Sequence, residues 1–176
     1  MLVGHINLDP STNDTADSVS ALVEALQRNG LQQYALVRSA ALAARLAALD
    51  DVGIGPLVQS PVMANCLLPR VDIVHVHEPT AGLAGLLLTL TRSIPYVLTH
   101  RGTVRLTGKP LVQAVYRRAA VVICEDDCEV AILRHGLPEL RVEVIPDLGV
   151  GSSANALLRL YQNSQSTPIA GNKGIQ

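Results

Sequence analysis

Short β-branched runs alternate with longer stretches rich in Ala and Leu along most of the chain. The short runs have the length of strands, and the longer ones repeat their apolar residues with the period of a helix. Such regular alternation is typical of repeated βα units, in which each helix returns the chain to start another parallel strand. The sequence therefore predicts an α/β fold built on a parallel sheet.

The alternation resolves into seven strands and seven helices. The expected strands are residues 2–8, 33–37, 53–58, 72–77, 96–99, 121–124 and 141–145, and the expected helices are residues 15–29, 40–49, 61–68, 81–91, 109–118, 127–135 and 154–162. Residues 121–124 are apolar throughout, as strands covered by helices on both faces are. We expect a single domain with a Rossmann-like, doubly wound parallel sheet.

The chain of 176 residues has the length of one domain, and 48% of its residues are hydrophobic, which is enough to form one core. We expect residues 1–149 to form the Rossmann-like unit and residues 150–163 to form a terminal helix that packs back on it. Residues 164–176 consist largely of Ser, Gln, Thr, Pro, Gly and Asn, which predicts a flexible tail.

Composition and charge exclude several classes of protein. The 14 Lys and Arg stand against 15 Asp and Glu, and Phe and Trp are absent, so the chain offers neither the charge nor the stacking platforms of a nucleic-acid binder. The longest apolar run, residues 81–90, has about half the length that crosses a bilayer. No signal peptide precedes it, and the three cysteines lack the spacing of a zinc site or a disulfide framework. We expect a cytoplasmic protein without a transmembrane segment.

Ligands of open parallel sheets bind where strands end and helices begin. This rule selects four segments, residues 9–14, 75–80, 99–109 and 125–127. Because the carboxyl ends of parallel strands meet at one edge of the sheet, these segments are expected to form the functional site.

Two histidines lie two residues apart on the strand at 72–77, so their side chains project from the same face. His75 and His77 could seat a metal ion or a proton relay, but we favour the alternative in which His75 is packed or hydrogen-bonded. No third ligand is spaced nearby, so we expect no metal here. We expect His77 and Glu78, nearer the strand end, to face a ligand.

Cationic side chains gather after the strand at 96–99. His100 and Arg101 follow it directly, and Arg105 and Lys109 precede the next helix. Such a group at a helix N-terminus favours a phosphate or a carboxylate, and it is equally consistent with a solvated surface.

Familiar cofactor and hydrolase motifs are missing. No Gly-x-Gly-x-x-Gly follows the first strand, no Gly-x-Ser-x-Gly occurs, and residues 102–109 lack the spacing of a phosphate loop. The acidic residues 125–127 suit either a divalent cation or the N-cap of the next helix, and we favour the cap. We therefore expect no bound cofactor.

Four segments share their order and spacing with one enzyme family. They are residues 22–38, residues 71–83 with the run Val-Asp-Ile-Val-His-Val-His-Glu-Pro, residues 94–102, and residues 115–149. Together they resemble the N-terminal half of retaining glycosyltransferases of family 4, in which two Rossmann-like domains face each other across a cleft.

The resemblance implies that the chain is the acceptor-binding domain of such an enzyme. It implies that His100 faces the reaction centre as a catalytic residue and that His77 and Glu78 line the cleft. Arg101 and Arg105 would then meet the acceptor, for example a lipid-linked or phosphorylated sugar.

The first loop departs from the pattern of the family. Family members carry a Gly-Gly pair where the backbone approaches the donor phosphates, whereas this loop holds Ser11, Thr12 and Asn13 and no glycine. The glutamate pair eight residues apart that is typical of the donor domain is absent as well.

Three functions fit these observations. The first is an acceptor-binding domain that transfers sugar only when a partner chain supplies the donor domain. The second is a noncatalytic binding or scaffold protein that forms a homodimer through its exposed cleft side. The third is a small enzyme with a metal at His75, His77 or residues 125–127.

Overall fold

The computed structural model describes residues 1–10, 14–101, 109–148 and 151–165. Its strands are β1 (Leu2–Asn7), β2 (Gln32–Val37), β3 (Val52–Ile54), β4 (Ile73–Val76), β5 (Tyr96–Thr99), β6 (Val121–Cys124) and β7 (Val142–Val144). Its helices are α1 (Asp14–Arg28), α2 (Ala40–Ala47), α3 (Pro61–Leu67), α4 (Gly82–Arg92), α5 (Pro110–Arg118), α6 (Asp127–Gly136) and α7 (Gly151–Gln165), and a short 3-10 helix, η1 (Pro79–Ala81), precedes α4.

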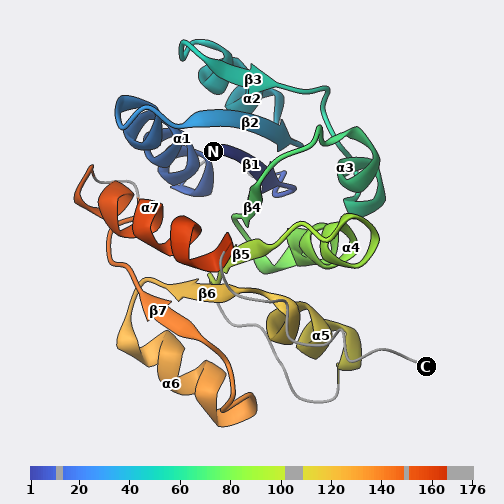
Figure 1. Cartoon of the computed structure of the whole chain (residues 1–176), viewed down its shortest axis with the longest axis vertical. Coiled ribbons are helices and arrows are strands. Elements are labelled where there is room, and N and C mark those ends of the chain that lie inside the picture. The colour runs from blue at the N-terminus through green and yellow to red at the C-terminus, as the bar shows by residue number, and fades with distance from the viewer. Residues whose placement is uncertain (11–13, 102–108, 149–150, 166–176) are drawn as a thin grey trace.

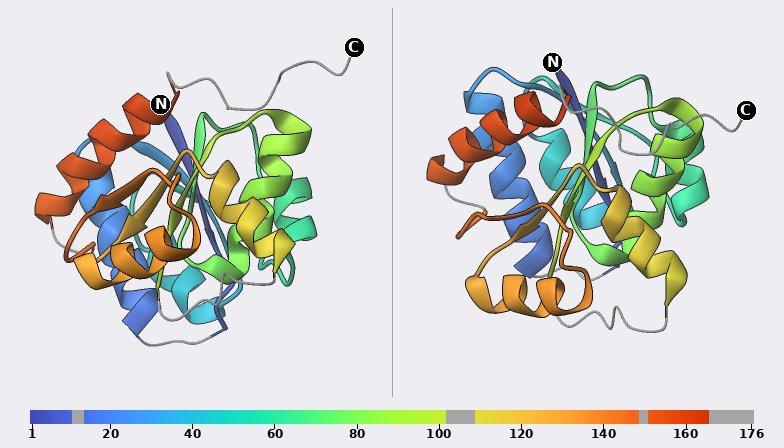
Figure 2. Two further views of the ribbon diagram at one scale, coloured as in Figure 1. Left: turned by 90° about the horizontal axis from the view of Figure 1, so that it is seen from below. Right: turned by 60° about the horizontal axis from the view of Figure 1, so that its bottom comes forward.

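All seven strands are parallel and lie in the order β3-β2-β1-β4-β5-β6-β7. β2 and β3 lie on one side of β1, and β4 to β7 lie on the other side. The order of strands therefore reverses between β1 and β4. Figures 1 and 2 show α1 and α7 on one face of the sheet and α3, α4 and α5 on the other. The predicted single-domain, Rossmann-like doubly wound sheet is confirmed.

Strand alternation divides the core into two layers. In β4, Ile73 is buried against the layer that includes Leu157 and Tyr161 of α7, and Val74 is buried against the opposite layer. The apolar stripe of α1 lies fully in the core, with Leu22 and Leu26 almost inaccessible to solvent.

The boundaries of most elements differ from expectation by one or two residues, and those of β3 and α7 differ by more. β3 ends at Ile54 rather than at Val58, because Pro56 has no backbone N–H to continue the ladder, although the N–H of Val58 still donates to the carbonyl of Val37 at 3.0 Å. α7 runs from Gly151 to Gln165, so it includes the first two residues of the expected tail. The rest of that expected tail lies outside the described residues.

A close approach between α4 and β5 requires glycine at position 85. A Cβ atom there would lie 2.6 Å from Cδ2 of the Tyr96 ring, which is fully buried. We expect Gly85→Ala to lower the free energy of unfolding by about 1–3 kcal/mol, because the ring cannot move without disturbing the core. Urea denaturation measures this loss. Leu90→Ala in the same helix is the control, because Leu90 is 61% exposed and should change stability by less than about 0.5 kcal/mol.

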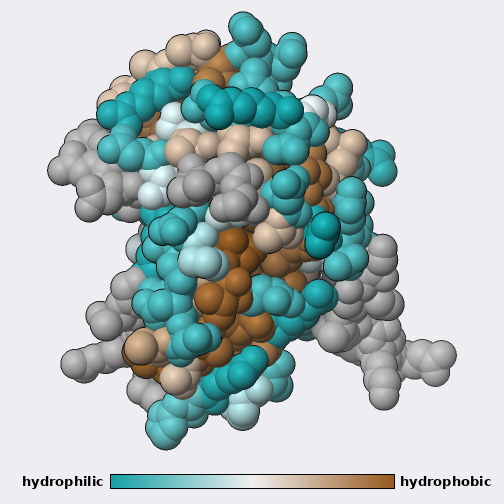
Figure 3. Space-filling model, turned by 90° about the vertical axis from the view of Figure 1, so that its left-hand side faces the viewer, coloured by the Kyte–Doolittle hydropathy of each residue, from teal (hydrophilic) through white to brown (hydrophobic). Residues whose placement is uncertain are grey.

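The β7 edge of the sheet is short and polar. Arg141, Glu143 and Val144 are exposed, and no strand among the described residues covers their outer side. Figure 2 (left) shows β7 in front when the molecule is seen from below. Figure 3 shows the left-hand side of the molecule as it is drawn in Figure 1. An apolar patch bordered by hydrophilic side chains lies in the lower half of this side.

Candidate functional site

A pocket of about 260 Å³ lies at the carboxyl edge of the sheet, where β1 and β4 are neighbours. It is lined by Asp9, Pro10, Glu78, Pro79, Thr80 and Arg101. This is the point at which the order of strands reverses, and the loops after β1 and β4 separate there to leave a crevice. The pocket therefore lies where ligands of doubly wound sheets bind.

Glu78 is the most perturbed acid of this pocket. Its side chain is 6% exposed and accepts a hydrogen bond from the backbone N–H of Leu8. Burial, aided by the nearby Asp9 carboxylate, raises the pKa of Glu78 to about 7, although the backbone hydrogen bonds act in the opposite direction. A carboxyl group with this pKa can donate or accept a proton at neutral pH.

Arg101 brings a positive charge to the same pocket. One of its guanidinium nitrogens donates to Oε1 of Glu125 at 2.9 Å, and its Nε is buried without a hydrogen-bond partner among the described residues. Glu125 directly follows β6, so all four segments selected from the sequence meet at this edge. Asp126 caps α6 through the N–H of Glu129 at 2.8 Å, as expected for an N-cap.

The remaining cationic and first-loop candidates are only partly described. Lys109 is exposed and immediately precedes α5. Arg105 and the loop residues Ser11, Thr12 and Asn13 lie outside the described residues.

His100 lies near this pocket in sequence but does not line it. Its side chain is 1% exposed, and its Nδ1 lies 2.6 Å from the hydroxyl of Tyr116 in α5. Burial lowers the pKa of His100, with a smaller opposing effect from Glu129, so the ring is neutral at neutral pH. The structure therefore holds His100 as a packed, hydrogen-bonded side chain beside α5.

His77 joins a buried histidine cluster on the opposite face of the sheet. The cluster is formed by His5, His75 and His77, all at most 3% exposed. Sequence reasoning missed His5, because it identified no third residue near the other two. The register supplies it, since β1 pairs with β4 so that His5 lies beside His75.

Hydrogen bonds fix which ring nitrogens of His5 and His77 donate and which accept. Nε2 of Gln33 donates to the carbonyl of Val23 at 2.9 Å, so Oε1 of Gln33 faces His5 and accepts from its Nε2 at 2.9 Å. Nδ1 of His5 is then the acceptor for Nε2 of His77 at 3.0 Å. The chain of hydrogen bonds thus runs from His77 through His5 to Gln33.

His75 ties α7 to the sheet. Its Nδ1 lies 2.6 Å from the hydroxyl of Tyr161 in α7, and its Nε2 lies 2.7 Å from Oγ1 of Thr99 in β5. Burial is the largest cause that lowers the pKa of all three histidines, to about 4 for His5, so the cluster is neutral at physiological pH.

The same cluster is the described group that comes nearest to a metal site. One ring nitrogen from each histidine lies within 4.8 Å of the others, and neutral imidazole is the form that binds metals. However, both nitrogens of His5 and His75 are already engaged in hydrogen bonds. A cation here would have to break them and enter a fully buried site without a carboxylate, so the geometry favours a hydrogen-bonded network.

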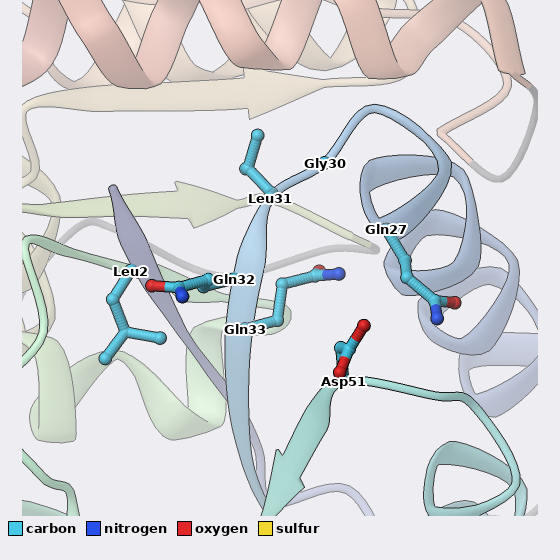
Figure 4. A pocket seen from close by; sticks show the side chains of 7 residues that line it. All are labelled: Leu2, Gln27, Gly30, Leu31, Gln32, Gln33 and Asp51. Atoms are coloured by element: carbon cyan, nitrogen blue, oxygen red, sulfur yellow. The ribbon is translucent and has the colours of Figure 1, made fainter.

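A second pocket, of about 450 Å³, lies at the opposite, amino edge of the sheet (Figure 4). It is lined by Leu2, Gln27, Gly30, Leu31, Gln32, Gln33 and Asp51. It gathers no cationic side chain among the described residues, and parallel sheets do not place their ligands at this edge.

In the part of the chain that the structure describes, no helix has the length and hydrophobicity needed to cross a membrane.

Comparisons with known proteins agree with this architecture. The sequence model of Glycosyltransferase Family 4 matches residues 16–147. Among solved structures, a sucrose-phosphate synthase from Thermosynechococcus elongatus superposes with a TM-score of 0.64 at 16% sequence identity, covering 93% of this chain and 98% of that one. A likeness at this identity shows the fold alone. No curated protein matches the sequence.

The family match covers most of the chain, including the loops after β4, β5 and β6 that surround the carboxyl-edge pocket. The protein belongs to Glycosyltransferase Family 4.

Proposed function

We propose that this protein is the acceptor-binding half of a two-domain glycosyltransferase and transfers a sugar only when a donor domain is supplied. The observation that carries the proposal is the pocket at the reversal point of the sheet, lined by two carboxyl groups, a hydroxyl and a guanidinium. Such a set of neighbouring donors and acceptors suits the hydroxyl groups of a sugar. Membership of the glycosyltransferase family supports this assignment.

The need for a second domain follows from what the family chemistry requires. The donor's diphosphate must be neutralised as it leaves, which takes cations or helix N-termini facing the acceptor across a cleft. The described residues form one Rossmann-like domain, with one wall of such a cleft. In our proposal the other wall, and the nucleotide-sugar site, belong to a partner chain.

Helix α7 fits this arrangement. It packs on α1 and anchors to His75, although it follows the last strand of the sheet. We infer that α7 corresponds to a segment which, in two-domain relatives, returns to the first domain.

The site residues take different roles in this proposal. Glu78 and Arg101 bind acceptor hydroxyls, and the neutral-pH titration of Glu78 suits it to hold a hydroxyl proton. Lys109, and Arg105 outside the described residues, would add positive charge for an anionic acceptor. Ser11, Thr12 and Asn13 of the first loop lie outside the described residues, and His100 is the proposed catalytic residue.

Binding by the single chain tests the acceptor assignment. We expect glucose or glucose 6-phosphate to shift the backbone NMR signals of Thr80 and Arg101, and UDP-glucose not to do so. Glu78→Gln should weaken binding about tenfold, because it removes a charged hydrogen bond worth about 1.5–3 kcal/mol. Gln32→Ala, in the amino-edge pocket, is the matched control and should leave binding unchanged.

Transfer in a reconstituted pair tests the role of His100. With a donor-domain partner present, we expect His100→Ala to lower turnover while the chain remains folded. His100→Asn serves as the second variant, because it preserves a hydrogen-bonding group toward Tyr116. Unchanged turnover in both folded variants would remove the catalytic assignment. Failure of every sugar to bind, alone or with the partner, would instead favour the noncatalytic scaffold.

A further inference from the structure

The outer edge of β7 has backbone groups that nothing in the described chain uses. The carbonyl of Arg141 accepts from the N–H of Val122, and the N–H of Ile145 donates to the carbonyl of Cys124. Alternate residues of a strand direct their polar groups to opposite sides, so those of Val142 and Val144 point away from β6. The edge is therefore ready to accept another strand.

Opposite charges lie two residues apart along this edge. Arg141 and Glu143 are exposed on the face that carries α7, and neither forms an ion pair within the described residues. Charged residues on an edge usually discourage pairing. Here the two signs cancel if the strand meets an antiparallel copy of itself.

From this pattern we infer that the protein forms a homodimer in which β7 pairs antiparallel with β7 of a second copy, across a two-fold axis at Val142. In this register Arg141 lies opposite Glu143 of the second copy, and the reverse pair follows by symmetry. The outward N–H of Val142 donates to the C=O of Val142 in the second copy, and the outward C=O accepts from the N–H there. The two sheets then form one continuous sheet.

This register places each charge opposite its counterpart. An antiparallel register shifted by two residues would place Arg141 opposite itself or Glu143 opposite itself. A parallel copy in register would put like charges side by side. Because directly opposed like charges destabilise paired strands, the alternatives are disfavoured.

The surface beside β7 matches the incoming strand. A groove of about 260 Å³ lies between β7 and α7, lined by Arg141, Glu143, Val144, Ile145, Ala156, Arg159, Leu160 and Asn163. Glu143 of the second copy would face the guanidinium groups of Arg141 and Arg159 there. The net charge of −1 per chain opposes association only weakly.

Charge reversal with a swap tests this interface. Sedimentation equilibrium over a range of concentrations should show a dimer for the wild type. Arg141→Glu or Glu143→Arg alone should raise the dissociation constant about tenfold or more, because each change turns two attractive pairs into two repulsive ones. The double variant R141E/E143R should restore the dimer. The exposed Arg70→Glu is the control and should leave the dimer intact.

Mixing gives a stricter test. In a mixture of R141E and E143R chains, every opposed pair is again of opposite sign, so a heterodimer should form from two weakly associating variants. Val142→Pro should abolish the dimer with little loss of stability, because it removes an N–H that points away from β6. A monomeric wild type, a dimer insensitive to these variants, or no recovery in folded double-variant and mixed samples would each overturn the inference.

Discussion

Acidification from pH 7.5 to 5.5 should lower the free energy of unfolding by about 4 kcal/mol through the three buried histidines. Over the same range, protonation of Glu78 should raise it by about 2 kcal/mol. His5, His75 and His77 have pKa values lowered by burial, so the unfolded chain binds more protons below pH 6.5, and stability falls as the pH falls. Glu78, with a pKa raised to about 7, binds its proton in the folded state first and acts in the opposite direction. His100 adds to the loss.

Chemical denaturation across this pH range separates the two effects. The wild type should lose about 2 kcal/mol between pH 7.5 and 5.5, and Glu78→Gln, which removes the opposing group, about 4 kcal/mol. Replacing His5 by Gln in the Glu78→Gln background should reduce the loss by about 1 kcal/mol. If the stability of the Glu78→Gln protein did not change over this pH range, the claim that the three histidines are buried in their neutral form would be contradicted.

Tyr161→Ala should lower the free energy of unfolding by about 3–5 kcal/mol, the cost of truncating a fully buried aromatic side chain. The change also leaves Nδ1 of His75 without its partner in α7. Tyr161→Phe isolates that second effect and should cost about 1–2 kcal/mol, because it keeps the packing and removes the hydroxyl. Urea denaturation measures both changes.

The control for this pair lies in the same helix. Asn155 is exposed, and Asn155→Ala should change stability by less than about 0.5 kcal/mol. If Tyr161→Ala were no more destabilising than Asn155→Ala, α7 would not be part of the core in solution.

The sequence predicts the framework of this protein well, because the framework depends on local periodicity. Strand and helix patterns repeat within each βα unit, and the rule for parallel sheets then brings the four selected segments to one edge. The pocket lined by Asp9, Glu78 and Arg101 draws on three of those segments, and Glu125 of the fourth pairs with Arg101.

What the sequence could not supply is the register between strands distant in the chain. His5 reaches His77 only because β1 and β4, about 70 residues apart, pair with a particular offset. Alternation along the extended chain separates neighbours in sequence: His77 turns to the α7 layer with His5, and Glu78 turns to the pocket. The sequence predicts that His77 and Glu78 both face a ligand, whereas their side chains lie on opposite sides of the chain.

Helix α7 also affects how the protein folds during its synthesis. Tyr161 contacts a strand residue 86 positions earlier, so the part of the sheet that α7 covers, beside α1, stays exposed until this helix emerges from the ribosome. A nascent chain that has already paired its strands would expose that apolar layer to other molecules, and loop closure over such a distance is slow. We expect chaperones to engage the nascent chain in this interval, and premature termination before residue 151 to yield an insoluble product.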